Sequence, residues 1–130
     1  MKKIFSFLLL SISFVTLAQL KPVSYKDGEQ KLNGFLISPQ KKATNNTGIL
    51  ILPAWKGIDE HSKEVAQNLS AEGYFAFVAD IYGEGNYPKD SKEAGEKSGY
   101  YKTNYKEYQK RIRLALEQLV KAGANAENVV

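Results

Sequence analysis

Two short apolar runs with an amphipathic segment between them constrain this chain more than any other feature of its sequence. Gly48–Leu52 is apolar throughout, and Tyr74–Ala79 is apolar and rich in aromatic residues. Strands that are apolar on both faces are typical of a parallel sheet covered by helices on both sides. Parallel neighbours need a long crossover, and the intervening segment has the length and pattern of a helix. The sequence therefore predicts the α/β class, built on a β-α-β unit.

The crossover helix is predicted over Glu60–Glu72. Asp59 stands where an N-cap acceptor is needed, and Gly73 stands where a left-handed residue ends a helix. The residues of the buried stripe recur at helical spacing: Ile58, Ser62, Val65, Ala66 and Leu69. Ligands of open parallel sheets bind beyond the carboxyl ends of the strands. We therefore expect a site in the two loops Pro53–Ile58 and Asp80–Pro88.

A β-hairpin is predicted ahead of this unit, over Lys21–Pro39. Asp27-Gly28 supplies the positive φ that its tight turn demands. After the unit, the polar stretch Gly83–Gly99 predicts one short helix near Asp90–Lys97.

A longer helix is predicted over Thr103–Lys121. Glu107 and Arg111 are expected to form an i,i+4 ion pair on it. The residues of its apolar face are Tyr105, Tyr108, Ile112, Ala115, Leu116 and Leu119. Asn128-Val129-Val130 reads as the start of a further buried strand.

The N-terminus reads as a secretory signal peptide over residues 1–18. Met1-Lys2-Lys3 is basic, Ile4–Leu17 is apolar, and Thr16-Leu17-Ala18 fits cleavage after Ala18. The apolar run is shorter than the roughly 20 residues that span a bilayer, so no stable membrane anchor is expected after cleavage. We expect an exported protein, periplasmic or extracellular, whose residues 19–130 belong to one domain.

Composition excludes several other classes. The chain has no cysteine, so neither a lipoprotein anchor nor a disulfide is expected. Cleavage would remove two lysines and lower the formal charge from +4 to +2. Such a small charge gives no reason to expect nucleic-acid binding.

Several motifs resemble one known family when their order and spacing are taken together. LPAW-x-G-I-x-E follows the first apolar run, A-x-x-L-S-x-x-G-Y ends the crossover helix, and A-D-I-Y-G ends the second run. The pattern continues at Glu93-Ala94, Tyr108, Arg111-Ile112-Arg113 and Ala115-Leu116-Glu117-Gln118-Leu119. Over about Leu32–Val130 the chain resembles the dienelactone hydrolase family of α/β-hydrolases. The resemblance implies the N-terminal part of an α/β-hydrolase fold, with an incomplete sheet.

The resemblance also implies hydrolysis of ester or lactone bonds in small molecules. The family's nucleophile, usually cysteine, lies on a G-x-C-x-G elbow and works with an Asp and a His further along the chain. That elbow follows a segment like Ala126–Val130, and this chain has no such motif and only one histidine. The nucleophile, Asp and His are therefore expected after Val130, and the 130 residues alone are expected to be inactive.

One part of the oxyanion hole is expected within the chain. By resemblance, the backbone N–H of Trp55 would be one donor. Ala54 stands where some family members place a glutamate, which argues against assuming the narrow dienelactone substrate. Lys56 and Tyr82 are expected to line the substrate pocket, together with Ala54.

Other sites find little support in the sequence. His61, the one histidine, lies in the first turn of a predicted helix and is expected on its solvated surface. Scattered carboxylates around one histidine give no metal-ligand spacing. Gly83-Glu84-Gly85 starts like a dinucleotide fingerprint, but Pro88 replaces the third glycine. No metal or cofactor is therefore expected.

Two other functions stay open from the sequence. The chain could be an exported, non-catalytic module that binds a small ligand or a partner, since it holds no nucleophile elbow. It could also be part of a different α/β-hydrolase, such as a peptidase or a lipase. The behaviour of the isolated chain distinguishes the binding module from a fragment of a hydrolase. Half a sheet with an open apolar edge should aggregate, whereas a binding module should be soluble.

Overall fold

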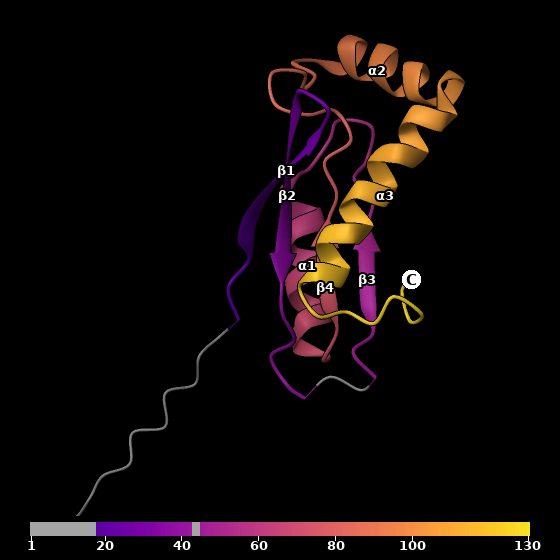
Figure 1. Ribbon diagram of the computed structural model, residues 1–130. Coiled ribbons are helices and arrows are strands. Elements are labelled where there is room, and N and C mark those ends of the chain that lie inside the picture. Colours follow the sequence, from indigo (N-terminus) through magenta and orange to yellow (C-terminus); the bar gives the residue numbers. More distant parts are fainter. Residues whose placement is uncertain (1–17, 43–44) are drawn as a thin grey trace, which may run out of the picture.

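The computed structural model describes residues 18–42 and 45–130, so the predicted signal peptide lies outside the described residues except for Ala18. A sheet forms the middle of the molecule, with α1 packed on one face and α3 on the other (Figure 1). The elements in chain order are β1 (Lys21–Asp27), β2 (Gln30–Ile37), β3 (Gly48–Ile51), α1 (Glu60–Ala71), β4 (Phe75–Val78), α2 (Ser91–Thr103) and α3 (Tyr105–Lys121).

The sheet confirms both the hairpin and the β-α-β unit. Its strand order is β1-β2-β4-β3. β1 and β2 pair antiparallel around Gly28, whose φ is +58°, and β2 pairs antiparallel with β4. β3 runs parallel to β4, with Leu50 opposite Phe77. The crossover between these two strands is α1, as predicted.

A further strand begins on the outer edge of β3. Val129 bridges Gly48 in the parallel sense. The Val130 N–H donates to the Gly48 carbonyl at 3.0 Å, and the Leu50 N–H donates to the Val130 carbonyl at 2.8 Å. Asn128-Val129-Val130 therefore pairs with the first part of β3, as the start of a strand would, although Val130 is exposed rather than buried.

The ends of α1 are fixed by the residues that the sequence singled out. The Asp59 carboxylate accepts the Ser62 N–H at 2.8 Å, and the Ser62 hydroxyl accepts the Asp59 N–H at 3.2 Å. This reciprocal capping box satisfies two N–H groups at the start of the helix. At the other end Gly73 adopts a φ of +99°, which an L side chain rarely tolerates.

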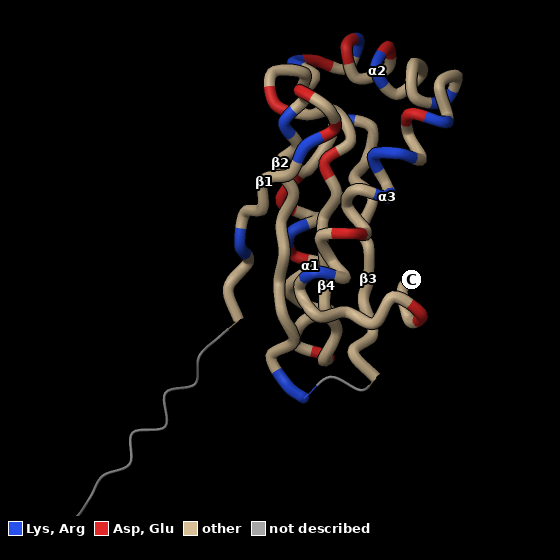
Figure 2. The backbone as a smooth tube through the Cα atoms, in the orientation of Figure 1, with Lys and Arg blue, Asp and Glu red and all other residues tan. Residues whose placement is uncertain are grey.

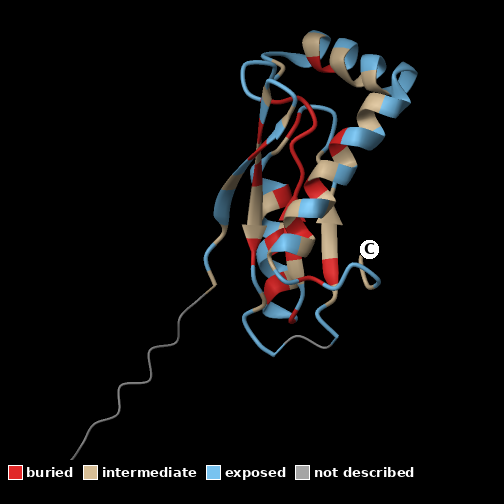
Figure 3. Ribbon diagram, in the orientation of Figure 1, coloured by how far each residue is buried: buried red, intermediate tan, exposed pale blue. Residues whose placement is uncertain are grey.

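β4 supplies the centre of two hydrophobic cores, one on each face of the sheet (Figure 3). Phe77 packs with Leu32 and Leu119 under α3. Ala76 and Val78 pack with Ile37 and Ala66 under α1. Alternate residues of a strand face opposite sides, so a strand between two helical layers must be apolar at every position.

The helix expected near Asp90–Lys97 is longer than predicted. α2 begins after Asp90, whose carboxylate accepts the Glu93 N–H at 2.8 Å, and it runs to Thr103 through two glycines. Tyr101 packs its ring 6.1 Å from that of Tyr108 on α3, which ties the last turn down. Tertiary packing therefore outweighs the low helix propensity of glycine here.

The predicted apolar face of α3 was wrong at Tyr105, which is exposed, and it left out Arg111, which is only 5% exposed. Arg111 donates from Nε to Asp27 Oδ2 at 2.7 Å, so its partner lies on β1. Glu107, the partner predicted for it, instead accepts the Tyr100 hydroxyl at 2.7 Å.

Charged residues of both signs are interspersed along α2 and α3 (Figure 2). Within residues 18–42 and 45–130, no helix has the length and hydropathy needed to cross a membrane.

Candidate functional site

A cavity of about 210 Å³ lies beyond the carboxyl ends of β3 and β4, between their loops and the two last helices. Its lining residues are Pro53, Ala54, Trp55, Ile81, Tyr82, Ser98, Tyr101, Lys102 and Tyr108. We call this cavity the Trp55 pocket. It brings together Ala54, Trp55 and Tyr82, three of the residues that the sequence interpretation placed at a substrate site. Its place is also the one where ligands of open α/β sheets bind.

The loop after β3 forms one wall of the Trp55 pocket. It turns back on itself where the Gly57 N–H donates to the Ala54 carbonyl at 2.8 Å, with Gly57 at a φ of +91°. Trp55 at the tip is 49% exposed. Its amide N–H donates to no other residue within the described ranges.

Tyr82, from the loop after β4, reaches across to this wall. It is only 7% exposed, and its hydroxyl donates to the Trp55 carbonyl at 2.6 Å. Burial raises the pKa of the Tyr82 hydroxyl above its ordinary value, and the neighbouring Tyr101 and Tyr108 add to the rise. The group therefore keeps its proton at neutral pH and stays a donor.

The loop that carries Tyr82 is organised by the buried carboxylate of Asp80. Its Oδ2 accepts the Asn33 N–H at 2.8 Å and the Tyr87 hydroxyl at 2.7 Å, and its Oδ1 accepts the Gly83 N–H at 2.9 Å. The sequence placed Asp80 only at the end of a strand. Gly83 and Tyr87 follow on its own loop, but Asn33 on β2 is 47 residues away, out of reach of a local pattern.

Arg111 holds the same loop from the side of α3. Its Nη1 donates to the Ile81 carbonyl at 2.8 Å and to the Tyr82 carbonyl at 3.3 Å. Asp27 fixes the guanidinium. Burial alone would raise the pKa of Asp27, but the hydrogen bonds from Lys110 and Arg111 bring it below its usual value. Asp27 thus stays ionised opposite Arg111.

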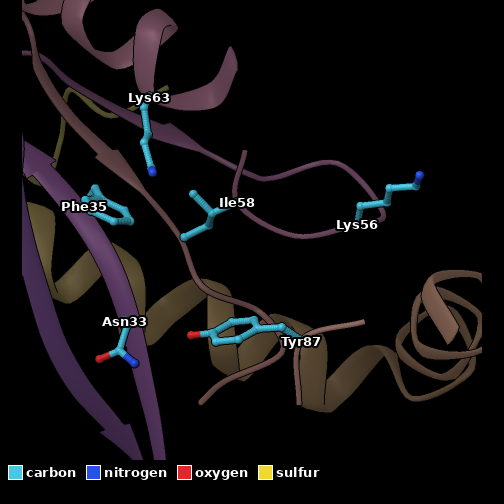
Figure 4. Close-up of a pocket in the computed structure, with 6 residues that line it drawn as sticks. All are labelled: Asn33, Phe35, Lys56, Ile58, Lys63 and Tyr87. Atoms are coloured by element: carbon cyan, nitrogen blue, oxygen red, sulfur yellow. The ribbon is translucent and has the colours of Figure 1, made fainter. Parts of the chain in front are cut away.

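Lys56 does not line the Trp55 pocket. It borders a separate hollow of about 290 Å³ with Asn33, Phe35, Ile58, Lys63 and Tyr87, and Figure 4 shows its ammonium directed away from the other five residues. The polar groups there are already engaged, because Lys63 pairs with Glu60 at 2.7 Å and Tyr87 with Asp80. Lys56 is therefore the predicted lining residue that the fold separates from the rest.

A third, larger hollow of about 470 Å³ lies between α2, α3 and the β1–β2 turn. Its polar side chains also bind one another. Gln30 accepts from Asn86 at 2.8 Å, and Glu107 accepts from Tyr100. The Trp55 pocket is the better candidate, since it has an unengaged backbone donor.

The described residues contain no group of three or more His, Cys, Asp or Glu side chains that could hold a metal ion. His61 is exposed on α1 and lines none of the three hollows, in line with its predicted surface position.

The sequence interpretation missed the far wall of the Trp55 pocket, which is made by Ser98, Tyr101, Lys102 and Tyr108. Tyr108 was predicted only as part of a helix face. The available signal was the seven-residue spacing of Tyr101 and Tyr108 around Asn104, which ends one helix and starts the next. This spacing can be interpreted only when α2 is known to extend as far as Thr103.

Comparison with known proteins identifies related sequences and folds. The sequence profile of a family described as "Dienelactone hydrolase family" matches residues 32–129. The comparison with curated proteins found no significant match. A protein named m3DLH superposes with a TM-score of 0.78 and 23% identity, over 87% of this chain and 48% of that one.

Two further solved structures agree with this likeness. A dienelactone hydrolase-like promiscuous phosphotriesterase from metagenomic libraries gives a TM-score of 0.77 at 23% identity, over 87% of this chain and 47% of its own. A protein described as a dienelactone hydrolase from Klebsiella pneumoniae gives 0.65 at 14% identity, over 86% and 48%. At these identities the likeness concerns fold alone, and it confirms a partial α/β-hydrolase fold. The chain spans about half the length of these structures.

Proposed function

The chain belongs to the dienelactone hydrolase family, and on that premise we propose that it is the N-terminal part of an exported hydrolase that cleaves ester or lactone bonds in small molecules. The observation that carries the proposal is the Trp55 pocket, with an unengaged backbone donor beyond the carboxyl ends of β3 and β4. A preformed donor at such a place is what acyl transfer needs for its developing oxyanion.

The position of the nucleophile follows from the strand that begins at Val129. This strand is parallel to β3, so its carboxyl end points to the same edge of the sheet as the Trp55 loop. A strand–turn–helix elbow there would lie beside that loop. We place the nucleophile, its His base and the orienting Asp after Val130.

The chemistry would proceed through a tetrahedral intermediate. The nucleophile attacks the carbonyl carbon, its proton passes to the histidine, and the carbonyl oxygen becomes an oxyanion. The Trp55 N–H would donate to this oxygen, together with the N–H of the residue after the nucleophile. Ala54 carries no carboxylate, so the histidine alone would activate the nucleophile.

The phosphotriesterase activity named for one of the similar structures suggests a second substrate type. A phosphotriester also develops negative charge on an oxygen as it is attacked. The same donors could stabilise that charge. A phosphotriester therefore belongs in the substrate panel, beside carboxylic esters and lactones.

The test uses the complete protein, obtained by continuing the reading frame past Val130. We expect hydrolysis of p-nitrophenyl acetate, abolished when the elbow nucleophile is replaced by alanine. Residues 19–130 alone should release p-nitrophenol no faster than buffer. Complete protein that hydrolyses no ester, lactone or phosphotriester would contradict the proposal. The non-catalytic binding module would then be the favoured function. Saturable quenching of Trp55 fluorescence by an added small-molecule ligand would support it.

Export is a separate part of the proposal. It rests on the basic, apolar and small-residue pattern of residues 1–18. Fractionation of expressing cells should find protein outside the cytoplasm, with Gln19 at its N-terminus. Protein that keeps Met1 and stays in the cytoplasm would contradict this part and leave the hydrolase proposal standing.

A further inference from the structure

We propose that Tyr82 is a positioning residue, whose hydroxyl holds the loop after β3 in the conformation that presents the Trp55 amide. This inference rests on the proposed function, since it concerns the same oxyanion donor. Its starting point is the 2.6 Å hydrogen bond from the Tyr82 hydroxyl to the Trp55 carbonyl, which joins the loops after β3 and β4.

The Tyr82 side of this contact is rigid. Arg111 holds the carbonyls of Ile81 and Tyr82, and Asp27 holds Arg111 in turn. The Tyr82 ring is buried and lies 5.8 Å from the ring of Tyr101. The hydroxyl therefore sits on a side chain whose backbone is held by hydrogen bonds and whose ring is restricted by packing.

The Trp55 side has few restraints of its own. Trp55 is half exposed, and the loop's internal hydrogen bond joins Gly57 to Ala54, the two residues that flank the tip. Gly57 adopts a positive φ, and a Cβ placed there would come 3.6 Å from the Tyr82 ring. The tip is therefore held by this internal bond and by Tyr82, whose hydroxyl binds the Trp55 carbonyl and whose ring lies beside Gly57.

Preorganisation makes this contact matter for catalysis. An oxyanion donor lowers the barrier only if it is already in place when charge develops, and a displacement of about 1 Å weakens its effect. The Trp55 carbonyl belongs to the peptide that joins Trp55 to Lys56, whereas the Trp55 N–H belongs to the peptide that joins Ala54 to Trp55, whose carbonyl the Gly57 N–H holds. Fixing the Trp55 carbonyl limits rotation at Trp55 between these two peptides, and so helps to keep the tip and its N–H in one conformation. The effect should appear in the chemical step rather than in substrate binding.

The principal variant is Tyr82→Phe in the complete protein, which removes the hydroxyl and keeps the ring. We expect kcat for p-nitrophenyl acetate to fall roughly 10-fold, with KM changed by less than about twofold. Tyr105→Phe is the matched control. Tyr105 is exposed on α3, lines none of the three hollows described above, and its hydroxyl binds no other described residue, so its kcat should stay close to that of the parent.

A second readout follows the loop itself and needs no activity. Trp55 is the one tryptophan of the sequence, so acrylamide quenching of its emission reports on the loop. Any tryptophan after Val130 is accounted for by subtracting the signal of Trp55→Phe. Tyr82→Phe should raise the quenching constant, and Tyr105→Phe should leave it unchanged.

Gly57→Ala tests the same restraint from the other side of the loop. The positive φ of Gly57 is strained for alanine, so the tip should shift, with kcat lowered and quenching raised as in Tyr82→Phe. This variant decides the question if Tyr82→Phe does not fold, as judged by its circular dichroism.

The outcomes separate the two proposals. Parent protein without hydrolytic activity overturns the proposed function, while the quenching comparison still tests the restraint. Tyr82→Phe that leaves both kcat and quenching unchanged overturns the positioning role. A rise in KM at constant kcat also overturns it, because Tyr82 would then contact the substrate rather than orient the donor.

Discussion

Asp80 shows at the level of single residues how this fold satisfies the polar groups that it buries. Across residues 18–42 and 45–130, no buried side-chain nitrogen or oxygen lacks a hydrogen-bond partner. Asp80 accepts three hydrogen bonds, and its own N–H donates to the Tyr25 hydroxyl at 3.1 Å. One buried residue thus joins β1 through its backbone N–H, and β2 and the loop that carries Tyr82 through its carboxylate.

Replacing Asp80 with asparagine should destabilise the protein by about 2 kcal/mol, because an amide nitrogen would face donors that need an acceptor. The free energy of unfolding in urea measures this loss. Glu84→Gln is the matched control, since Glu84 is exposed and its ion pair with Lys31 is screened by solvent. Equal losses in the two variants would show that burial of Asp80 does not decide the effect.

Two tyrosines beside Asp80 should lose their hydroxyl protons only at unusually high pH. Burial raises the pKa of Tyr25 to about 12, and burial together with the hydrogen bond to Asp80 raises that of Tyr87 to about 12. The unfolded chain loses these protons near pH 10. The free energy of unfolding should therefore fall as pH rises from about 10 to about 12. The absorbance of tyrosinate at alkaline pH measures this titration, and Tyr87→Phe should reduce the part of the absorbance change that occurs near pH 12. Identical titration curves with and without urea would contradict this assignment.

The elements differ in how much local sequence decides them. The hairpin, α1 and the two inner strands were predicted because each carries its own signal: a turn glycine, a capping residue or an unbroken apolar run. The length of α2 was not, since contacts with α3 hold its glycine-containing last turns. Periodicity also assigned Arg111 a neighbour on its own helix. The true partner, Asp27, is 84 residues away and no local window contains it.

The same limit applies to the candidate site. Ala54, Trp55 and Tyr82 were found because they follow strands, and the ends of parallel strands meet at one edge. Lys56 follows a strand too, but the turn at Gly57 places it over a different hollow. Which way a loop turns depends on contacts such as that of Tyr82, which sequence spacing does not show.

Two glycines provide a matched pair at the level of elements. A Cβ on Gly34 in β2 would lie 2.5 Å from Phe77 Cζ and 2.6 Å from the Val78 carbonyl oxygen, so Gly34→Ala should cost about 2 kcal/mol. A Cβ on Gly99 in α2 would meet no atom within 4 Å, so Gly99→Ala should stabilise by about 0.5–1 kcal/mol. Thermal melting of both variants measures the difference, and a shift of the same sign in both would refute it.

At the scale of the whole molecule, exposed apolar residues lie after the end of β3 and on the strand that pairs with it. Leu52, Trp55 and Val130 are all exposed, the last at 81%. The pairing seen along the outer edge of β3 involves Asn128 and Val130. An edge of this kind invites pairing with another chain.

Residues 19–130 alone should therefore self-associate as their concentration rises, whereas the complete protein should not. Size-exclusion chromatography with light scattering measures the mass of each. A monodisperse monomer of residues 19–130 that melts cooperatively would refute this expectation, and it would favour the independent binding module over the hydrolase.

The strand order has a consequence for the order in which the protein is made. β2 pairs with β4 and not with β3, so the hairpin is ready long before its neighbour in the sheet has been synthesised. The ribosome must add Phe75–Val78 before either face of the sheet can be covered. Until then the nascent chain has nothing to close around, and neither wall of the Trp55 pocket exists. Because β4 is made after β1, β2, β3 and α1, the chain cannot close its sheet before Val78 is added, and until then it stays in the unfolded state that passage through a narrow channel would require.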